Sequence, residues 1–260
     1  MQERHAPTLL ESALRYDRSV MLVVLVAVPA AAWLWIVLMA RDMYGAMSGA
    51  AAWMTTTEWN WPHLLLLVAM WAVMMTAMML PTAAPLILLY AAAARRSAEA
   101  NPARCVHALA AGYLMVWWLF SVVLTALQRL LAAAFVLTPM MEPASPIVGA
   151  VLLGIAGVYQ LTPLKRACLR ACRSPLGFLM QGWRNGAAGA FRLGVRHGAY
   201  CLGCCWALML ILFAGGVMNL VVIVTLTVWV LVEKSAPFGE RTPVVSGAAL
   251  LGMAVWMLVR

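Results

Sequence analysis

The chain has 260 residues, of which 65% are hydrophobic and only 10% are charged, and its mean hydropathy is +0.90. This composition excludes a water-soluble globular protein and leaves little room for a second, soluble domain. The formal net charge of +9 does not indicate nucleic-acid binding. The basic residues fall between apolar runs, where positive charge reports orientation in a lipid bilayer and contact with anionic headgroups.

Apolar runs long enough to cross a membrane recur along the chain, since a helix needs about 20 apolar residues to span the hydrocarbon. The predicted fold class is all-α: a polytopic transmembrane helical bundle over residues 19–260, preceded by a cytoplasmic tail at 1–18. We expect seven spans, near residues 20–40, 62–94, 106–126, 147–164, 197–213, 220–232 and 244–259. The fifth and sixth are short, so a six-span alternative, in which they form one kinked or re-entrant unit, stays open.

The distribution of Lys and Arg predicts the orientation of the spans. With a cytoplasmic N-terminus, fifteen of the 18 basic residues fall on inner segments, and only Arg41, Arg129 and Arg260 fall on outer ones. This bias follows the positive-inside rule. Residues 165–196 carry seven Lys or Arg and no acidic residue, and we expect a basic cytoplasmic loop there. Seven spans place the C-terminus outside, and six place it inside.

Sulfur-containing residues gather toward the cytoplasmic end of this predicted bundle. Spacings of three and four residues bring side chains onto one face of a helix, and such spacings recur in three segments: near the start of the fifth span, in the basic loop and in the second span. An acidic residue ends the sixth span at the same level. The candidate metal ligands are Cys168, Cys172, His197, Cys201, Cys204, Cys205, Met74, Met75, Met78, Met79 and Glu233.

Thiolates and thioethers are soft ligands that favour Cu(I), whereas Zn²⁺ prefers Cys, His and carboxylate. Copper as Cu(I) is therefore the expected metal, with another soft metal as the alternative. Disulfides persist outside the cytoplasm, so we expect reduced thiols. The competing interpretation is that the cysteines are small buried hydrophobes and the methionines pack helices. On the outer side, Met39, Met43, Met47, Met140 and Met141 could gather metal, whereas His63 and His107 read as interfacial residues.

Three motifs carry a resemblance to a known family. They are Trp71-x-x-Met74-Met75-x-x-Met78-Met79-x-Pro81, then Tyr159-Gln160-x-x-Pro163-x-Lys165-x-x-Cys168-Leu169-x-x-Cys172, and Gly198-x-x-Cys201-x-Gly203-Cys204-Cys205-Trp206 followed by Met209, Gly216, Met218-Asn219 and Glu233-Lys234. Together they resemble the bacterial family of predicted metal-binding integral membrane proteins, a family without an established reaction for which copper handling has been suggested. The resemblance covers roughly residues 60–235 and implies a multi-pass protein of the bacterial inner membrane.

Three functions fit these observations. The first is a Cu(I) carrier, chaperone or permease that exchanges metal with a membrane or periplasmic partner protein. The second is a metal-dependent membrane oxidoreductase in which Glu233 transfers protons, although the chain has only four histidines. The third is a subunit of a larger membrane complex with merely buried cysteines. The sequence shows no phosphate-binding loop, so pumping driven by ATP on this chain is not expected.

Overall fold

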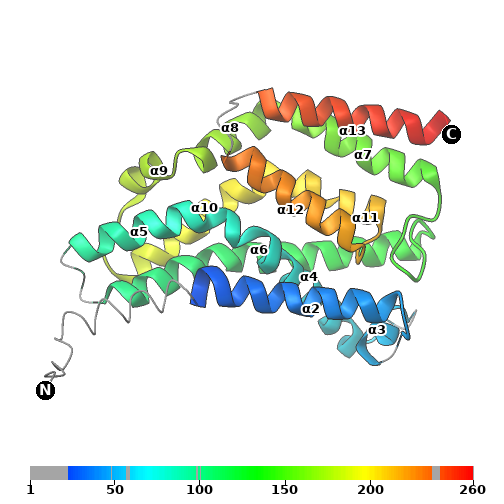
Figure 1. The fold of residues 1–260 in the computed structure, drawn as a ribbon, viewed down its shortest axis with the longest axis horizontal. Coiled ribbons are helices and arrows are strands. Elements are labelled where there is room, and N and C mark those ends of the chain that lie inside the picture. The colour runs from blue at the N-terminus through cyan, green and yellow to red at the C-terminus, as the bar shows by residue number, and fades with distance from the viewer. Residues whose placement is uncertain are drawn as a thin grey trace, which may run out of the picture.

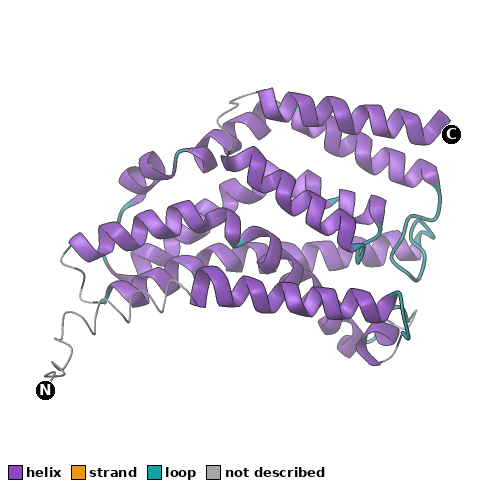
Figure 2. Ribbon diagram, viewed as in Figure 1, coloured by secondary structure: helices purple, strands orange, loops and turns teal. Residues whose placement is uncertain are grey.

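The computed structural model describes residues 23–47, 49–56, 59–97, 99, 101–235 and 241–259. The predicted tail at 1–18 lies outside the described residues. The described part is helical and contains no strand, which confirms the all-α class (Figure 2). Its elements are η1 (Val23–Ala27), α2 (Val28–Met43), α3 (Gly49–Met54), α4 (Trp61–Met79), η2 (Pro81–Ala83), α5 (Ala84–Arg96), α6 (Pro102–Ala133), α7 (Pro146–Gln160), α8 (Pro163–Arg173), α9 (Pro175–Gly182), α10 (Gly186–Met209), α11 (Ile211–Gly215), α12 (Leu220–Ser235) and α13 (Arg241–Val259).

Local sequence explains where several helices begin. The side chains of Asn60, Asn101 and Thr162 accept hydrogen bonds from backbone N–H groups in the first turns of α4, α6 and α8. A proline stands at the first or second position of each of these helices, where its missing N–H costs nothing. Pro81 then interrupts α4, because a proline ring cannot continue an α-helical hydrogen-bond ladder, and the short η2 turn leads into α5.

The long helices lie side by side and alternate in direction (Figure 1). Helices α2, α6, α10 and α13 run one way, and α4, α7 and α12 run back. We call the end where α12 finishes and α13 begins the cysteine end, and the end where α4 begins and α6 finishes the distal end. Helices α7 and α13 pack together at one edge of the bundle, whereas α6 and α10 form its most extensive helix pair (Figure 1).

Glycines permit the close crossing of α6 and α10. A Cβ added at Gly194 would overlap the carbonyl oxygen of Leu109, and one added at Gly112 would overlap that of Phe191. Small residues at such positions let helix backbones approach closely. The crossing fixes the position of the cysteine-bearing part of α10 against Tyr113 on α6.

Among the described residues, five helices or helix pairs are long and apolar enough to cross a membrane. The count rises to six if α7 and α8, which meet at a bend of 66°, form one span. Helix α12 has 16 residues, or about 24 Å at 1.5 Å per residue, so it is shorter than the other candidates. It is nevertheless a separate element that runs antiparallel to α10 (Figure 1).

Two sequence expectations about segment 165–196 differ from the structure. The segment is helical and contains most of α8, all of α9 and the first part of α10, because Thr162, Pro163 and Pro175 start new helices where positive charge alone suggested a loop. The α10 helix that carries the fifth predicted span also begins before that span, at Gly186 rather than His197. Cys201 therefore lies about 22 Å along α10 from its first residue.

Candidate metal centre

Helix α8 brings one pair of cysteines onto α10. After the bend that follows α7, α8 packs against α10 and α12. Cys172 Sγ lies 4.0 Å from Cys204 Sγ, although 32 positions separate the two residues in the sequence. Cys168 lies above Gly203, where an added Cβ would be 2.8 Å from its Sγ. The two predicted cysteine groups are thus adjacent in space.

Cys201 is the most closely contacted thiol of the group. Its side chain is fully buried, and its Sγ lies 3.0 Å from the hydroxyl oxygen of Tyr113 and 2.7 Å from Nζ of Lys234. The same ammonium donates to the hydroxyl oxygen of Thr82 at 3.0 Å. A cation held against a thiol favours the thiolate form, which is the form that binds metals.

Cys204 and Cys205 are oriented by the backbone of α10 itself. Their thiols donate to the carbonyl oxygen of Cys201, at 3.0 and 2.9 Å. Both side chains are buried. Cys204 therefore lies between Cys172, whose Sγ is 4.0 Å away, and the backbone of Cys201. The sixth cysteine, Cys105, lies elsewhere and contacts Glu99.

The break between α4 and α5 lies next to Tyr113, the partner of Cys201. The carbonyl oxygen of Met79 accepts hydrogen bonds from Tyr113, at 2.9 Å, and from Thr82, at 2.7 Å. Pro81 leaves this part of the backbone without its helical partners, so side chains from α6 and η2 satisfy it. The four predicted methionine ligands, Met74, Met75, Met78 and Met79, are all fully buried on α4. The last of them, Met79, is linked to Cys201 through its backbone carbonyl and the Tyr113 hydroxyl.

Two polar residues that end α12 have different partners. The carboxylate of Glu233 lies 2.6 Å from Nζ of Lys165, and the two side chains are 1% and 0% exposed. Its backbone carbonyl accepts from Nε of Arg173 at 2.8 Å. The sequence predicted Glu233 as a metal ligand. In the structure Glu233 pairs with Lys165, and the next residue, Lys234, contacts the thiol of Cys201. The sequence feature that could have identified Lys234 as a site residue is its position at the end of an apolar run.

His197 is buried one helical turn before Cys201. Its ring packs against those of Tyr113 and Phe178, with centroids 5.6 and 5.3 Å away. Its Nδ1 has no hydrogen-bond partner. His197 and Cys201 both contact Tyr113, so they lie on one face of α10 as their spacing predicted. Two residues that the sequence did not single out, Tyr113 and Thr82, also contact the side chains of this site.

The site offers a pair of thiols as metal ligands. In the part of the chain that the structure describes, no group of three or more His, Cys, Asp or Glu side chains is arranged to hold a metal ion. The closest donor set is the pair Cys172 and Cys204, with Cys201 and its cation beside it. Zn²⁺ requires four ligands in structural sites, whereas Cu(I) is selected by soft thiolates and accepts as few as two of them.

Comparison with known proteins supports the same metal. Residues 68–257 match the family model PpoB2, whose description is copper chaperone. The chain belongs to this copper-chaperone family. The matched range contains every residue of the candidate metal centre, from Met74 to Lys234, and copper handling is thereby confirmed at the level of the family. Neither a curated protein nor a solved structure matches the chain.

Proposed function

We propose that this copper-chaperone family member is an integral membrane Cu(I) carrier, in which Cys172 and Cys204 hold the ion and Cys201 assists. The observation that carries the proposal is the 4.0 Å approach of two thiols from different helices. Thiolates select Cu(I) among biological metals. Copper is cargo here rather than a resident cofactor, so an incomplete set of ligands suits a site that must both accept and release it.

The positive charge of Lys234 supports this assignment. Two thiolates bound to one Cu(I) carry a net charge of −1, and a buried charge is costly unless an opposite charge compensates it. The ammonium of Lys234, 2.7 Å from Cys201 Sγ, supplies that compensation. The neighbouring ion pair between Lys165 and Glu233 neutralises itself, so it adds no net charge to the site.

The proposed membrane position follows from helix lengths. From the level of Met79 and Cys201 to the distal end, the helical segments of α4, α6 and α13 are about 28 to 30 Å long at 1.5 Å per residue, close to the hydrocarbon thickness of a bilayer. We place the thiols at the cytoplasmic boundary of a bacterial inner membrane. Helix α5, helix α9 and the first halves of α6 and α10 then extend beyond that boundary, and all of them except α9 carry Arg side chains.

The methionines of α4 provide a path through the bundle. Met70, Met74 and Met78 recur every four residues and are fully buried, and thioether sulfur is a soft ligand for Cu(I). Their stripe leads from the distal half of α4 to the break beside the thiols. Cu(I) moving along it would exchange one soft ligand for the next, and a membrane or periplasmic partner protein would supply or receive the ion.

The test is the copper content of the purified full-length chain. Cu(I) is added under reducing, oxygen-free conditions to wild type, to the variant C172S/C204S and to the matched control Cys105→Ser. X-ray absorption at the copper edge reports sulfur ligation. We expect wild type and the control to bind the same amount of Cu(I) with sulfur ligands, and the double variant to lose the thiolate-bound ion. Unchanged copper in C172S/C204S would refute this assignment.

A further inference from the structure

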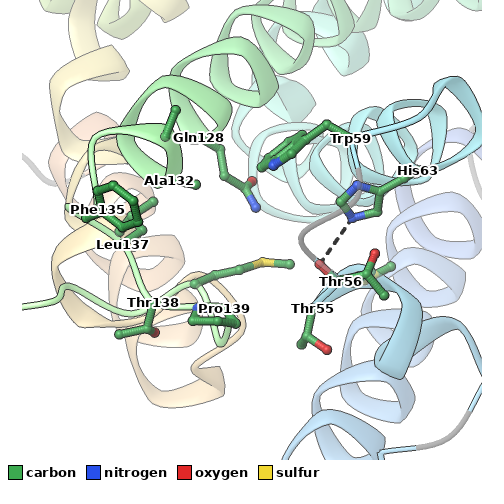
Figure 3. A pocket seen from close by; sticks show the side chains of 13 residues that line it. Thr55, Thr56, Trp59, His63, Gln128, Ala132, Phe135, Leu137, Thr138 and Pro139 are labelled. Carbon is green, nitrogen blue, oxygen red and sulfur yellow. Dashed lines mark hydrogen bonds between the residues drawn. The ribbon is translucent and has the colours of Figure 1, made fainter.

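A second cluster of soft donors lines a cavity at the distal end of the bundle, remote from the cysteines. The cavity has a volume of about 390 Å³ and lies between α3, the start of α4, the end of α6 and the loop that follows it (Figure 3). Among its lining residues are one imidazole, that of His63, and two thioethers, those of Met54 and Met141. All three side chains are at most 3% exposed.

The imidazole of His63 presents a free lone pair. Its Nε2 lies 3.3 Å from the carbonyl oxygen of Met54, and because a carbonyl can only accept, Nε2 carries the proton. The other ring nitrogen, Nδ1, is then an acceptor, and it is buried with no hydrogen-bond partner. A histidine that binds a metal through one nitrogen usually donates the other N–H to a backbone carbonyl or carboxylate. His63 already has that arrangement.

The surroundings hold this ring in place. Asn60 caps α4 by accepting from the backbone N–H of His63 at 3.0 Å. The ring of Trp59 packs edge-on against the imidazole, with centroids 5.2 Å apart. Figure 3 shows the His63 ring and the Gln128 side chain extending toward the cavity from opposite walls, with a hydrogen bond from the ring to the α3 side.

Met141 reaches the cavity from an unusual backbone conformation. Its φ is +59°, a left-handed value that a non-glycine residue rarely adopts. Its backbone N–H donates to the carbonyl oxygen of Thr138 at 2.9 Å, and its carbonyl accepts from Val217 at 3.2 Å. These contacts tie the loop to the connection between α11 and α12, so the buried thioether is held at the cavity wall although the local backbone conformation is unfavourable.

From this geometry we propose that His63 Nδ1, Met54 Sδ and Met141 Sδ form a Cu(I) loading site at the distal end of the bundle. The inference rests on the proposed function, because it assigns the place where the carrier first receives its cargo. One imidazole and two thioethers suit Cu(I). Among the lining residues that the structure describes there is no carboxylate, and Ca²⁺ and Mg²⁺ prefer such oxygen ligands. Met54 and His63 precede the range matched by the copper-chaperone family, and Met141 lies within it.

The position of this site complements that of the thiols. His63 and Met79 are 16 residues apart on one helix, which corresponds to about 24 Å along its axis. Buried Met70, Met74 and Met78 lie between them. The distal site binds Cu(I) through neutral ligands, whereas the thiol centre binds it through anionic thiolates. Transfer toward the cysteines is therefore the direction in which Cu(I) is bound more strongly.

The experiment uses the full-length chain in the C172S/C204S background, so that the thiol centre does not mask weaker binding. Cu(I) alone is titrated against a chromophoric Cu(I) chelator without oxygen. Three further variants are made in that background: His63→Gln, M54L/M141L, and the control Met180→Leu, which lies on α9 and does not line the cavity. Circular dichroism and thermal unfolding verify that each variant is folded.

We expect the background protein to bind one Cu(I) with nitrogen and sulfur ligation. His63→Gln and M54L/M141L should each weaken that binding at least tenfold, and Met180→Leu should leave it unchanged. The inference is overturned if the background protein binds no Cu(I), or if neither cavity variant alters its affinity. Failure of the proposed function gives a different result, since the copper content of C172S/C204S would then equal that of wild type.

Discussion

Lys234 is the side chain that gives the thiol centre its charge. Its ammonium contacts Cys201 Sγ at 2.7 Å and Thr82 at 3.0 Å, and the side chain is only partly exposed. Hydrogen bonds to charged groups contribute about 1.5–3 kcal/mol. The contact therefore stabilises an anionic thiolate, and with it an anionic copper–thiolate complex, in a part of the molecule where most neighbouring groups are apolar.

We predict that Lys234→Met lowers the affinity for Cu(I) by tenfold or more, since 1.4 kcal/mol corresponds to a factor of ten. Methionine has a similar length, so packing changes little while the charge is lost. Competition with a Cu(I) chelator measures the effect. The control is the double variant K165M/E233L, which removes the adjacent buried ion pair as a unit and should retain wild-type affinity. Equal affinities for Lys234→Met and wild type would contradict the role assigned to Lys234.

At the scale of elements, the crossing of α6 and α10 determines whether the site can assemble. Tyr113 on α6 contacts Cys201 on α10, and the crossing at Gly112 and Gly194 fixes the distance between the two helices. An added methyl group at Gly194 would overlap the Leu109 carbonyl, which belongs to the backbone and cannot rotate away. Overpacking of this kind costs about 1–3 kcal/mol and displaces the backbone.

We predict that Gly194→Ala lowers the midpoint of thermal unfolding and reduces Cu(I) binding, because α10 must move away from Tyr113. The matched control is Gly154→Ala in α7, where an added Cβ meets no atom within 4 Å. That change should be neutral or stabilise the fold by about 0.5–1 kcal/mol, because alanine replaces glycine within a helix. Thermal unfolding in detergent with and without Cu(I) measures both effects. A Gly194→Ala protein as stable as the control would disprove the tight crossing.

The placement of the cysteines on α8 and α10 shows which features of the site the sequence could reveal. Periodic spacing was sufficient to place Cys201, Cys204 and Cys205 on α10, and Cys168 and Cys172 on one helix, because helical neighbours are fixed by local geometry. Their mutual approach depends on the bend before α8 and on Gly203 beneath Cys168. The partners Tyr113 and Thr82 come from other helices, and no local pattern specifies contacts between distant segments.

The same distinction applies to polar residues at helix ends. Glu233 and Lys234 are adjacent in the sequence, and either could have faced the thiols. Residues one apart on a helix point about 100° away from each other, so the rotation of α12 decides which one does. That rotation is set by packing against α8, which supplies Lys165 for Glu233. The sequence located the two residues correctly but could not assign their partners.

For the whole molecule, the arrangement of charges agrees with a membrane orientation. The basic residues of α5, α8 and α10 lie toward the cysteine end, as do Lys234 and Arg241, whereas Arg41 and Arg129 lie at the distal end (Figure 1). By the positive-inside rule, this distribution supports the proposed placement of the cysteine end in the cytoplasm. Counting α12 as a short span gives seven crossings, and the two ends of the chain then face opposite sides of the membrane.

Labelling in intact cells tests this topology. Phe135 and Met180 are 87% and 75% exposed and belong to the distal and cysteine ends, respectively. In a background without the partly exposed Cys168 and Cys172, we predict that Phe135→Cys reacts with a membrane-impermeant maleimide, and that Met180→Cys reacts only after the cells are permeabilised. An epitope tag after residue 260 should be accessible from outside, because α12 crosses the membrane and α13 returns. A tag that becomes accessible only on permeabilisation would establish six spans. The reverse labelling pattern of Phe135→Cys and Met180→Cys would invert the proposed orientation, and with it the direction of copper transfer.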